Sequence, residues 1–175
     1  YLLGLAPEVQ EQVALETMGV DLAPAGAAAA FERLPLTRAV VQEALRLYPP
    51  AFTIVRVAKG EDELAGEQVP AGSMVVIAPW ILHRHRKRWA HPERFDPTRF
   101  LPGAPPVDRF AYLPFGVGPR VCIGAQFALM EATLVLARLV REFRLELVGP
   151  KRVTPVAVFT TVPDRVPVFR LTARV

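Results

Sequence analysis

Hydrophobic positions recur every three or four residues in two stretches of this chain, and both stretches predict amphipathic helices. Residues 7–16 begin with proline, carry a glutamate in the first turn and place Val9 and Val13 four residues apart on one side. Residues 35–48 repeat the pattern with a longer apolar side, and Pro49-Pro50 ends it because proline cannot continue a helix. We therefore expect a short helix followed by a better defined one.

A third stretch, residues 125–143, is apolar on nearly every side and is interrupted by Glu131 and Arg138. Helices of this composition are buried, so we expect a buried helix here. Residues 21–30 are rich in alanine, proline and glycine, and we expect a loop.

Short apolar runs separated by turn residues predict strands. Residues 52–58, 63–69 and 73–78 are expected to form a small antiparallel sheet. Runs near the C-terminus, around a turn at residues 163–165, predict a terminal hairpin; they are 145–147, 156–159 and 166–171. The expected fold class is therefore mainly α with small antiparallel β-sheets. A long meander, residues 90–113, joins the two regions, and a loop of that length in a compact domain is usually functional.

The composition narrows the class of protein. With 51% hydrophobic and 22% charged residues in 175, the chain is globular and long enough for one domain with a substantial core. A formal charge of +4 suits an acidic protein partner or an anionic cofactor. We expect no nucleic-acid partner, because no cluster of basic and aromatic residues stands out.

The single cysteine permits no internal disulfide, which fits either a reducing compartment or a thiol kept for chemistry, and we expect a cytoplasmic location. No window reaches the ~20 apolar residues of a membrane span. The chain opens at Tyr1 without an initiator methionine and reads like the end of one helix running into the next, so we expect it to be truncated.

That cysteine, Cys122, lies in a turn-rich segment with three glycines, a proline and an arginine, directly before the third predicted helix. The positive end of a helix dipole favours a thiolate over a thiol, and a thiolate is a metal ligand. An inert buried cysteine is the alternative, and it is the commonest fate of a lone cysteine.

The segment resembles the haem-binding signature of the cytochrome P-450 superfamily, Phe-x-x-Gly-x-Arg-x-Cys-x-Gly. All five named positions are filled, by Phe115, Gly118, Arg120, Cys122 and Gly124. Further stretches that match the family in the expected order are Glu43-Ala44-Leu45-Arg46, Leu47-Tyr48-Pro49-Pro50, Val69-Pro70-Ala71-Gly72, Pro92-Glu93-Arg94-Phe95 and Phe95-Asp96-Pro97-Thr98-Arg99-Phe100. Several motifs in order are far more specific than any one alone.

The resemblance covers essentially the whole chain and implies the C-terminal, haem-binding part of a single P-450 domain, residues 1–175. The family's central helix, with its acid-alcohol pair, would then precede Tyr1. We expect the chain by itself to be inactive and to capture haem weakly.

For the cofactor, haem b (iron protoporphyrin IX), the resemblance implies Cys122 as the proximal iron ligand. It also implies glycines that let the backbone pass close to the macrocycle, a phenylalanine that packs on the sulfur and two arginines that pair with the propionates. These are Gly116, Gly118, Gly124, Phe115, Arg120 and Arg56. A core phenylalanine and surface arginines are the alternatives.

The resemblance further implies a buried triad of Glu43, Arg46 and Arg94 that pins the meander and positions the haem loop. Glu43 and Arg46 stand three residues apart on a predicted helix, where their side chains can meet. The alternative is a solvated pair that contributes only ~0.3 kcal/mol, with Arg94 unrelated to it.

Two segments match regions that line the family's substrate pocket, although either could be plain strand core. The residues are Ala51, Phe52, Thr53, Ile54, Thr160 and Thr161. A basic run, residues 83–88, could face an acidic ferredoxin or flavodoxin domain. A solvated charged turn is an alternative interpretation, and a His-x-His metal site is a weaker one.

The resemblance therefore implies that the parent protein is a haem-dependent monooxygenase. It would insert one oxygen atom from O2 into a small apolar substrate, with electrons from a ferredoxin or a flavoprotein reductase. The alternatives are a haem-thiolate peroxygenase, an inactive haem-binding remnant, and a haem-free protein in which Cys122 is a redox or nucleophilic thiol.

Overall fold

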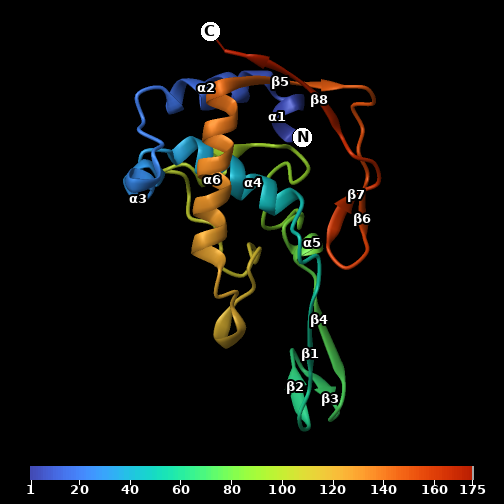
Figure 1. Ribbon diagram of the computed structural model, residues 1–175. Helices are drawn as coiled ribbons and strands as arrows, with labels where there is room; N and C mark the ends of the chain where they lie inside the picture. Colours follow the sequence, from blue (N-terminus) through green and yellow to red (C-terminus); the bar gives the residue numbers. More distant parts are fainter. Residues whose placement is uncertain (175) are drawn as a thin grey trace.

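The computed structural model describes residues 1–174, which contain six α-helices, eight short strands and three 3-10 helices (Figure 1). The α-helices are α1 (Leu2–Leu5), α2 (Pro7–Thr17), α3 (Ala27–Glu32), α4 (Pro35–Leu47), α5 (Pro79–Leu82) and α6 (Ala125–Glu142). The strands are β1 (Ile54–Val57), β2 (Asp62–Leu64), β3 (Glu67–Val69), β4 (Met74–Ile77), β5 (Phe143–Val148), β6 (Pro155–Ala157), β7 (Thr161–Pro163) and β8 (Val168–Ala173). The 3-10 helices are η1 (Pro24–Gly26), η2 (Pro97–Phe100) and η3 (Gly118–Arg120). The expected class, mainly α with small antiparallel sheets, is confirmed.

The core lies where α2, α4 and α6 meet. Figure 1 shows α6 crossing α4, with α2 and the β5–β8 pair near the C-terminal end of α6. Val13, Val40 and Val140, one from each helix, are almost completely buried together with Leu3. This cluster fixes the helix that carries Glu43 and Arg46 against the helix that follows Cys122.

The start of α4 shows why the sequence folds there. Pro35 occupies the first helical position, where its missing N–H costs nothing. The amides of Leu36 and Thr37 donate to the carboxylate of Glu16 on α2, at 2.7 and 2.8 Å. Glu16 therefore satisfies donors that would be orphaned at the helix end, and its negative charge lies at the positive end of the dipole.

Within residues 1–174 the strands pair only in twos. The predicted small sheet is two separate antiparallel pairs, β1–β4 with Ile54 opposite Ile77, and β2–β3. Near the C-terminus β5 pairs with β8, while β6 and β7 form their own hairpin. The expected terminal hairpin is therefore wrong in its pairing, because period-two patterns identify strands but not their partners.

Two expectations about helices were also wrong. Residues 21–30 contain η1 and the start of α3 where we expected a loop. Alanine is the strongest helix former, and Ala30 is buried against Leu34 and Ala137. The last helix, α6, is not buried as a whole: Phe127 and Val135 are 64% and 62% exposed, because α2, α3 and α4 cover only one of its sides.

Candidate functional site

The loop that carries Cys122 is closed by backbone hydrogen bonds. The Gly116 amide donates to the Leu113 carbonyl at 3.2 Å, and the Cys122 amide donates to the Phe115 carbonyl at 2.9 Å. The Cys122 carbonyl accepts from the Ala125 amide at 3.3 Å, at the first residue of α6. The thiol is exposed, so this turn presents a sulfur to the outside at the start of a helix.

Two of the predicted glycines are required by backbone conformation. Gly116 and Gly118 have φ of +75° and +76°, a region in which residues with a Cβ are strained. Gly124 has an ordinary φ of −88°, and a Cβ added there would lie 3.9 Å from the Cys122 Sγ. That distance is an ordinary van der Waals contact, so within residues 1–174 neither the backbone conformation nor the neighbouring atoms require a glycine at this position.

An open cleft of about 390 Å³ lies in front of this loop. One side is formed by the loop itself, with Phe115, Gly116, Arg120 and Cys122; the other is residues 50–56 without Phe52. Arg56 and Arg120, far apart in the sequence, thus line the same cleft as Cys122. Neither guanidinium pairs with a carboxylate anywhere in residues 1–174; Arg56 Nη1 donates to the neighbouring Val55 carbonyl at 2.9 Å.

The donors in the cleft fit a haem group. A thiol lies beside apolar Ile54, Val55 and Phe115, which suit a flat macrocycle. The two unpaired guanidinium groups suit its two propionates, because arginine matches a carboxylate in a two-point contact.

The predicted substrate residues divide between two cavities. Ala51, Thr53 and Ile54 line the cleft of Cys122. Phe52, Thr53 and Thr161 line a second cavity of about 330 Å³, so Thr53 is common to both. Thr161 is tied to the same segment, since its amide and hydroxyl donate to the carbonyls of Pro50 and Pro49 at 3.0 and 2.7 Å. Thr160 lines neither cavity.

Glu43 and Arg46, on α4, form a completely buried pair. Arg46 Nε and Nη2 donate to the two carboxylate oxygens of Glu43 at 2.7 and 2.8 Å, and both side chains are 0% exposed. The remaining donors of Arg46 reach the carbonyls of His83, Pro92 and Arg94 at 2.7, 2.7 and 3.1 Å. All five N–H groups of the guanidinium are therefore used, and three of them hold the His83 carbonyl and the meander turn at Pro92 and Arg94.

The structure corrects the third member of this cluster. The Arg94 side chain is exposed and contributes only its backbone carbonyl. Arg99, on η2, occupies the expected place instead: its Nε lies 3.5 Å from Glu43 Oε1, and its Nη2 donates to the His91 carbonyl at 3.2 Å. Arg99 Nε is buried without a hydrogen-bond partner in the described chain, so its contact with Glu43 is electrostatic.

Sequence analysis missed His83, which is completely buried at the junction of α4, α5 and the meander. Its Nδ1 is 3.1 Å from the Arg46 carbonyl, and its Nε2 accepts from the Leu113 amide at 2.7 Å. Burial, together with the nearby positive charges of Arg46 and Arg84, lowers the pKa of His83 to about 4. The ring is therefore neutral at physiological pH.

The basic run is consequently not a uniform charged turn. Arg84 is largely covered and stacks on Trp80 with its guanidinium carbon 3.6 Å from the ring centre. Arg86, Lys87 and Arg88 are exposed, and Arg88 pairs with Asp108 at 2.8 Å. A His-x-His metal site is contradicted, since both nitrogens of His83 have partners, and no cluster of potential metal ligands occurs in residues 1–174.

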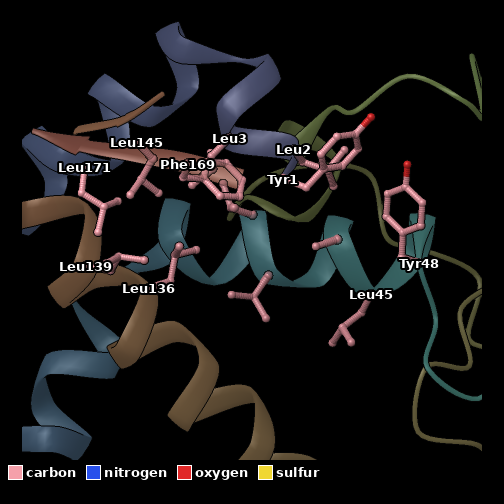
Figure 2. A pocket seen from close by; sticks show the side chains of 13 residues that line it. Tyr1, Leu2, Leu3, Leu45, Tyr48, Leu136, Leu139, Leu145, Phe169 and Leu171 are labelled. Atoms are coloured by element: carbon pink, nitrogen blue, oxygen red, sulfur yellow. The ribbon is translucent and has the colours of Figure 1, made fainter. Parts of the chain in front are cut away.

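Another cavity, of about 600 Å³, lies between α1, α4, α6 and the β5–β8 pair (Figure 2). Figure 2 shows Leu45 and Tyr48 on α4, Leu136 and Leu139 on α6, and Phe169 from β8 around it. Its lining is apolar apart from two tyrosines and contains none of the predicted site residues, so its size does not make it the functional site.

Comparison with known proteins gives a consistent family. A family model described as Cytochrome P450 matches residues 1–166. Cyclooctat-9-en-7-ol 5-monooxygenase of Streptomyces melanosporofaciens is 43% identical over 83% of this chain and 32% of its own length. Thromboxane-A synthase of Sus scrofa is 40% identical over 83% and 28%. Pentalenene oxygenase of Streptomyces avermitilis is 37% identical over 99% and 39%.

The chain thus spans between 28% and 39% of the length of these relatives. Among residues 1–174, no helix has both the length and the apolar character needed to cross a membrane.

Proposed function

Because this chain belongs to the cytochrome P450 family, we propose that the whole protein is a haem-dependent monooxygenase. It would insert one oxygen atom from O2 into an apolar organic substrate, using electrons from a redox partner. The observation that carries the proposal is the cleft that joins Cys122, Arg120 and Arg56.

The family implies a haem cofactor, and we propose haem b. Bound haem would supply the iron at which O2 is activated. In this chain the Cys122 thiolate would hold the iron and donate electron density to it. Arg120 and Arg56 would hold the propionates, and Phe115 would keep the sulfur dry.

The backbone after Cys122 supports a ligand role for the sulfur. In residues 1–174, the amides of Ile123 and Gly124 donate to no backbone carbonyl, so both are available to the thiolate. Hydrogen bonds of this kind tune the potential of a metal site.

We propose that Glu43, Arg46 and Arg99 position the loop of Cys122 without contacting the cofactor. The pair is buried, and its hydrogen bonds hold the meander that leads to Leu113. Residues 1–175 would act as the C-terminal haem-binding part of one domain, inactive by themselves.

The substrate would approach between residues 51–54 and the β6–β7 hairpin. Thr53 lines both the cleft and the adjacent cavity, and Thr161 is fixed beside it, so these residues would face the substrate while Thr160 would not. Two relatives bear the names of oxygenases of pentalenene and of cyclooctat-9-en-7-ol, which supports an apolar substrate.

Electrons would come from a ferredoxin or a flavoprotein. The exposed Arg86 and Lys87 would offer positive charge to an acidic partner, whereas Arg88 already pairs with Asp108 and the buried His83 would not take part. A cytoplasmic location stays a prediction from the sequence.

Carbon monoxide difference spectroscopy of the reduced full-length protein tests this proposal. We expect the red-shifted Soret band of a thiolate-ligated haem, its loss in Cys122→Ala, and its retention in Val121→Ala, which changes the exposed neighbour. A protein that binds no haem, or a Cys122→Ala variant that keeps the band, would refute the proposal.

A haem-thiolate enzyme that is not a monooxygenase, such as a peroxygenase, is the second candidate. One relative is named thromboxane-A synthase, that is, a synthase rather than an oxygenase, and this name supports the second candidate. Turnover that requires NAD(P)H and a reductase would support the monooxygenase, and turnover with peroxide alone, or with neither, would support the alternative.

A further inference from the structure

We propose that His83 is a positioning residue that ties the Glu43–Arg46 helix to the loop of Cys122 through one fixed tautomer of a buried neutral ring. The inference rests on the proposed function, since it assigns His83 a role in holding Cys122 for the haem.

The contacts of the ring determine the tautomer. The Leu113 amide can only donate, so Nε2, 2.7 Å away, must be the acceptor. The Arg46 carbonyl can only accept, so Nδ1, 3.1 Å away, must carry the hydrogen. A single neutral tautomer therefore satisfies both groups, and a doubly protonated ring would direct a second N–H against the Leu113 amide.

His83 is also held in both directions by the helix. Its own carbonyl accepts from Arg46 Nη1 at 2.7 Å, while its ring donates to the Arg46 carbonyl. The ring is 0% exposed and packs beside Tyr112, with centroids 5.3 Å apart. The ring is thereby held by α4, while the His83 amide donates to the Pro79 carbonyl of α5 at 2.8 Å.

The link continues to the sulfur through the backbone. Leu113, whose amide is held by His83, accepts at its carbonyl from the Gly116 amide at 3.2 Å. Phe115, in the same turn, accepts from the Cys122 amide at 2.9 Å. His83 therefore anchors the residue at which the turn of Cys122 begins.

Side-chain substitutions can separate the two hydrogen bonds. In His83→Gln the amide oxygen reaches the Nε2 position and can accept from Leu113; in His83→Asn the amide reaches the Nδ1 position and can donate only to Arg46. His83→Phe keeps the ring and loses both bonds. His85→Phe, at an exposed histidine two residues away, is the matched control.

The test uses the full-length holoprotein and two readouts, amide hydrogen exchange at Leu113 and Gly116 and the thiolate-type Soret band of the reduced carbon monoxide complex. In His83→Phe and His83→Asn we expect the amides of Leu113 and Gly116 to exchange about tenfold faster than in the wild type. We also expect part of the Soret band to move to the position of a haem that has no thiolate ligand. We expect His83→Gln to restore both, and the control to change neither.

Glu16→Gln, which weakens the cap of α4 far from the loop, separates positioning from general destabilisation. The inference would be overturned if Glu16→Gln lost as much of the band as His83→Phe when both variants are equally destabilised. It would also be overturned if His83→Phe showed the exchange rates and the spectrum of the wild type. A wild-type protein without the band would refute the proposed function, while the exchange at Leu113 and Gly116 would still decide whether His83 holds the turn.

Discussion

Arg46 lies one helical turn after Glu43 on α4, and the two side chains form a bidentate ion pair from which solvent is completely excluded. A surface pair at this spacing contributes a few tenths of a kcal/mol. A buried pair behaves differently, because removing one partner leaves an uncompensated charge in the interior. The pair is therefore a point at which single substitutions should have large effects.

Arg46→Met should lower the free energy of unfolding by about 3–5 kcal/mol, because it leaves the Glu43 carboxylate without its partner and the carbonyls of His83, Pro92 and Arg94 without a donor. Arg138→Met removes an exposed arginine that pairs with Glu142 at 3.6 Å on α6, and should cost about 0.5 kcal/mol or less. Denaturant unfolding of the full-length protein measures both. Equal costs for the two variants would contradict the buried assignment.

Arg99 and Arg94 provide a sharper comparison. Arg99→Met should destabilise the protein by about 1–3 kcal/mol, because Glu43 loses a positive neighbour and the His91 carbonyl loses a donor. Arg94→Met removes an exposed side chain and should change stability by about 0.5 kcal/mol or less. Denaturant unfolding measures both variants. A larger loss of stability in Arg94→Met than in Arg99→Met would support Arg94, as predicted from the sequence, as the third member of the cluster.

Sequence analysis assigned Arg94 instead of Arg99 to the cluster because the meander contains the same short motif twice. The pattern Pro-x-Arg-Phe occurs twice, at residues 92–95 and 97–100, five residues apart. Motif matching cannot choose between the copies. Only the fold does so, because Asp96 donates its amide to Glu43 at 2.9 Å and thereby brings the second copy to the pair.

Other features were predicted correctly where the signal is local and missed where it depends on distant contacts. The helices that begin at Pro7 and Pro35 and the glycine turn at Gly116 were predicted, because their signals are local. His83 was missed because it is followed by charged residues that suggest solvent, and its burial depends on contacts 30 and more residues away. Burial of α6 was overestimated because hydrophobicity shows which faces need a partner but not whether the chain supplies one.

Tyr112 should resist ionisation in alkaline solution. Burial, with the charge of Glu43 nearby, raises the pKa of Tyr112 far above its usual value. In the unfolded chain the phenol of Tyr112 ionises near pH 10, whereas in the folded protein it stays protonated. The stability that the protonated phenol contributes should therefore be lost as the pH rises above that value. Unfolding curves between pH 8 and about 11 measure this loss.

Tyr112→Phe is the control for that titration. It removes the hydrogen bond from the hydroxyl to the Gln42 carbonyl, 2.9 Å long, and should cost about 1 kcal/mol at neutral pH. It should also reduce the alkaline loss of stability. An alkaline curve identical to that of the wild type would show that Tyr112 is not the group that resists ionisation.

His83 should make the protein sensitive to mild acid. Its pKa is lowered to about 4 in the folded state, against about 6.5 in an unfolded chain, so between these values only the unfolded state binds the proton. The stability from the neutral ring is therefore complete above pH 6.5 and is lost as the pH falls toward 4, by up to about 3 kcal/mol. His83→Gln should flatten this part of the profile in urea unfolding, and His85→Gln should not; equal slopes in all three proteins would contradict the assignment.

The two arginines of the cleft should differ in how strongly they retain haem. Arg120 has no competing carboxylate in the described chain and belongs to the loop of Cys122, so Arg120→Met should speed haem transfer to an apoglobin acceptor by about tenfold to a hundredfold. Arg56→Met should have a smaller effect, because one of its donors already serves the Val55 carbonyl. Arg152→Met, at an exposed arginine outside the cleft, is the matched control and should leave the transfer rate unchanged. If Arg120→Met released haem no faster than this control, the cleft would not be where the propionates bind, and the fit between its donors and haem would have to be abandoned.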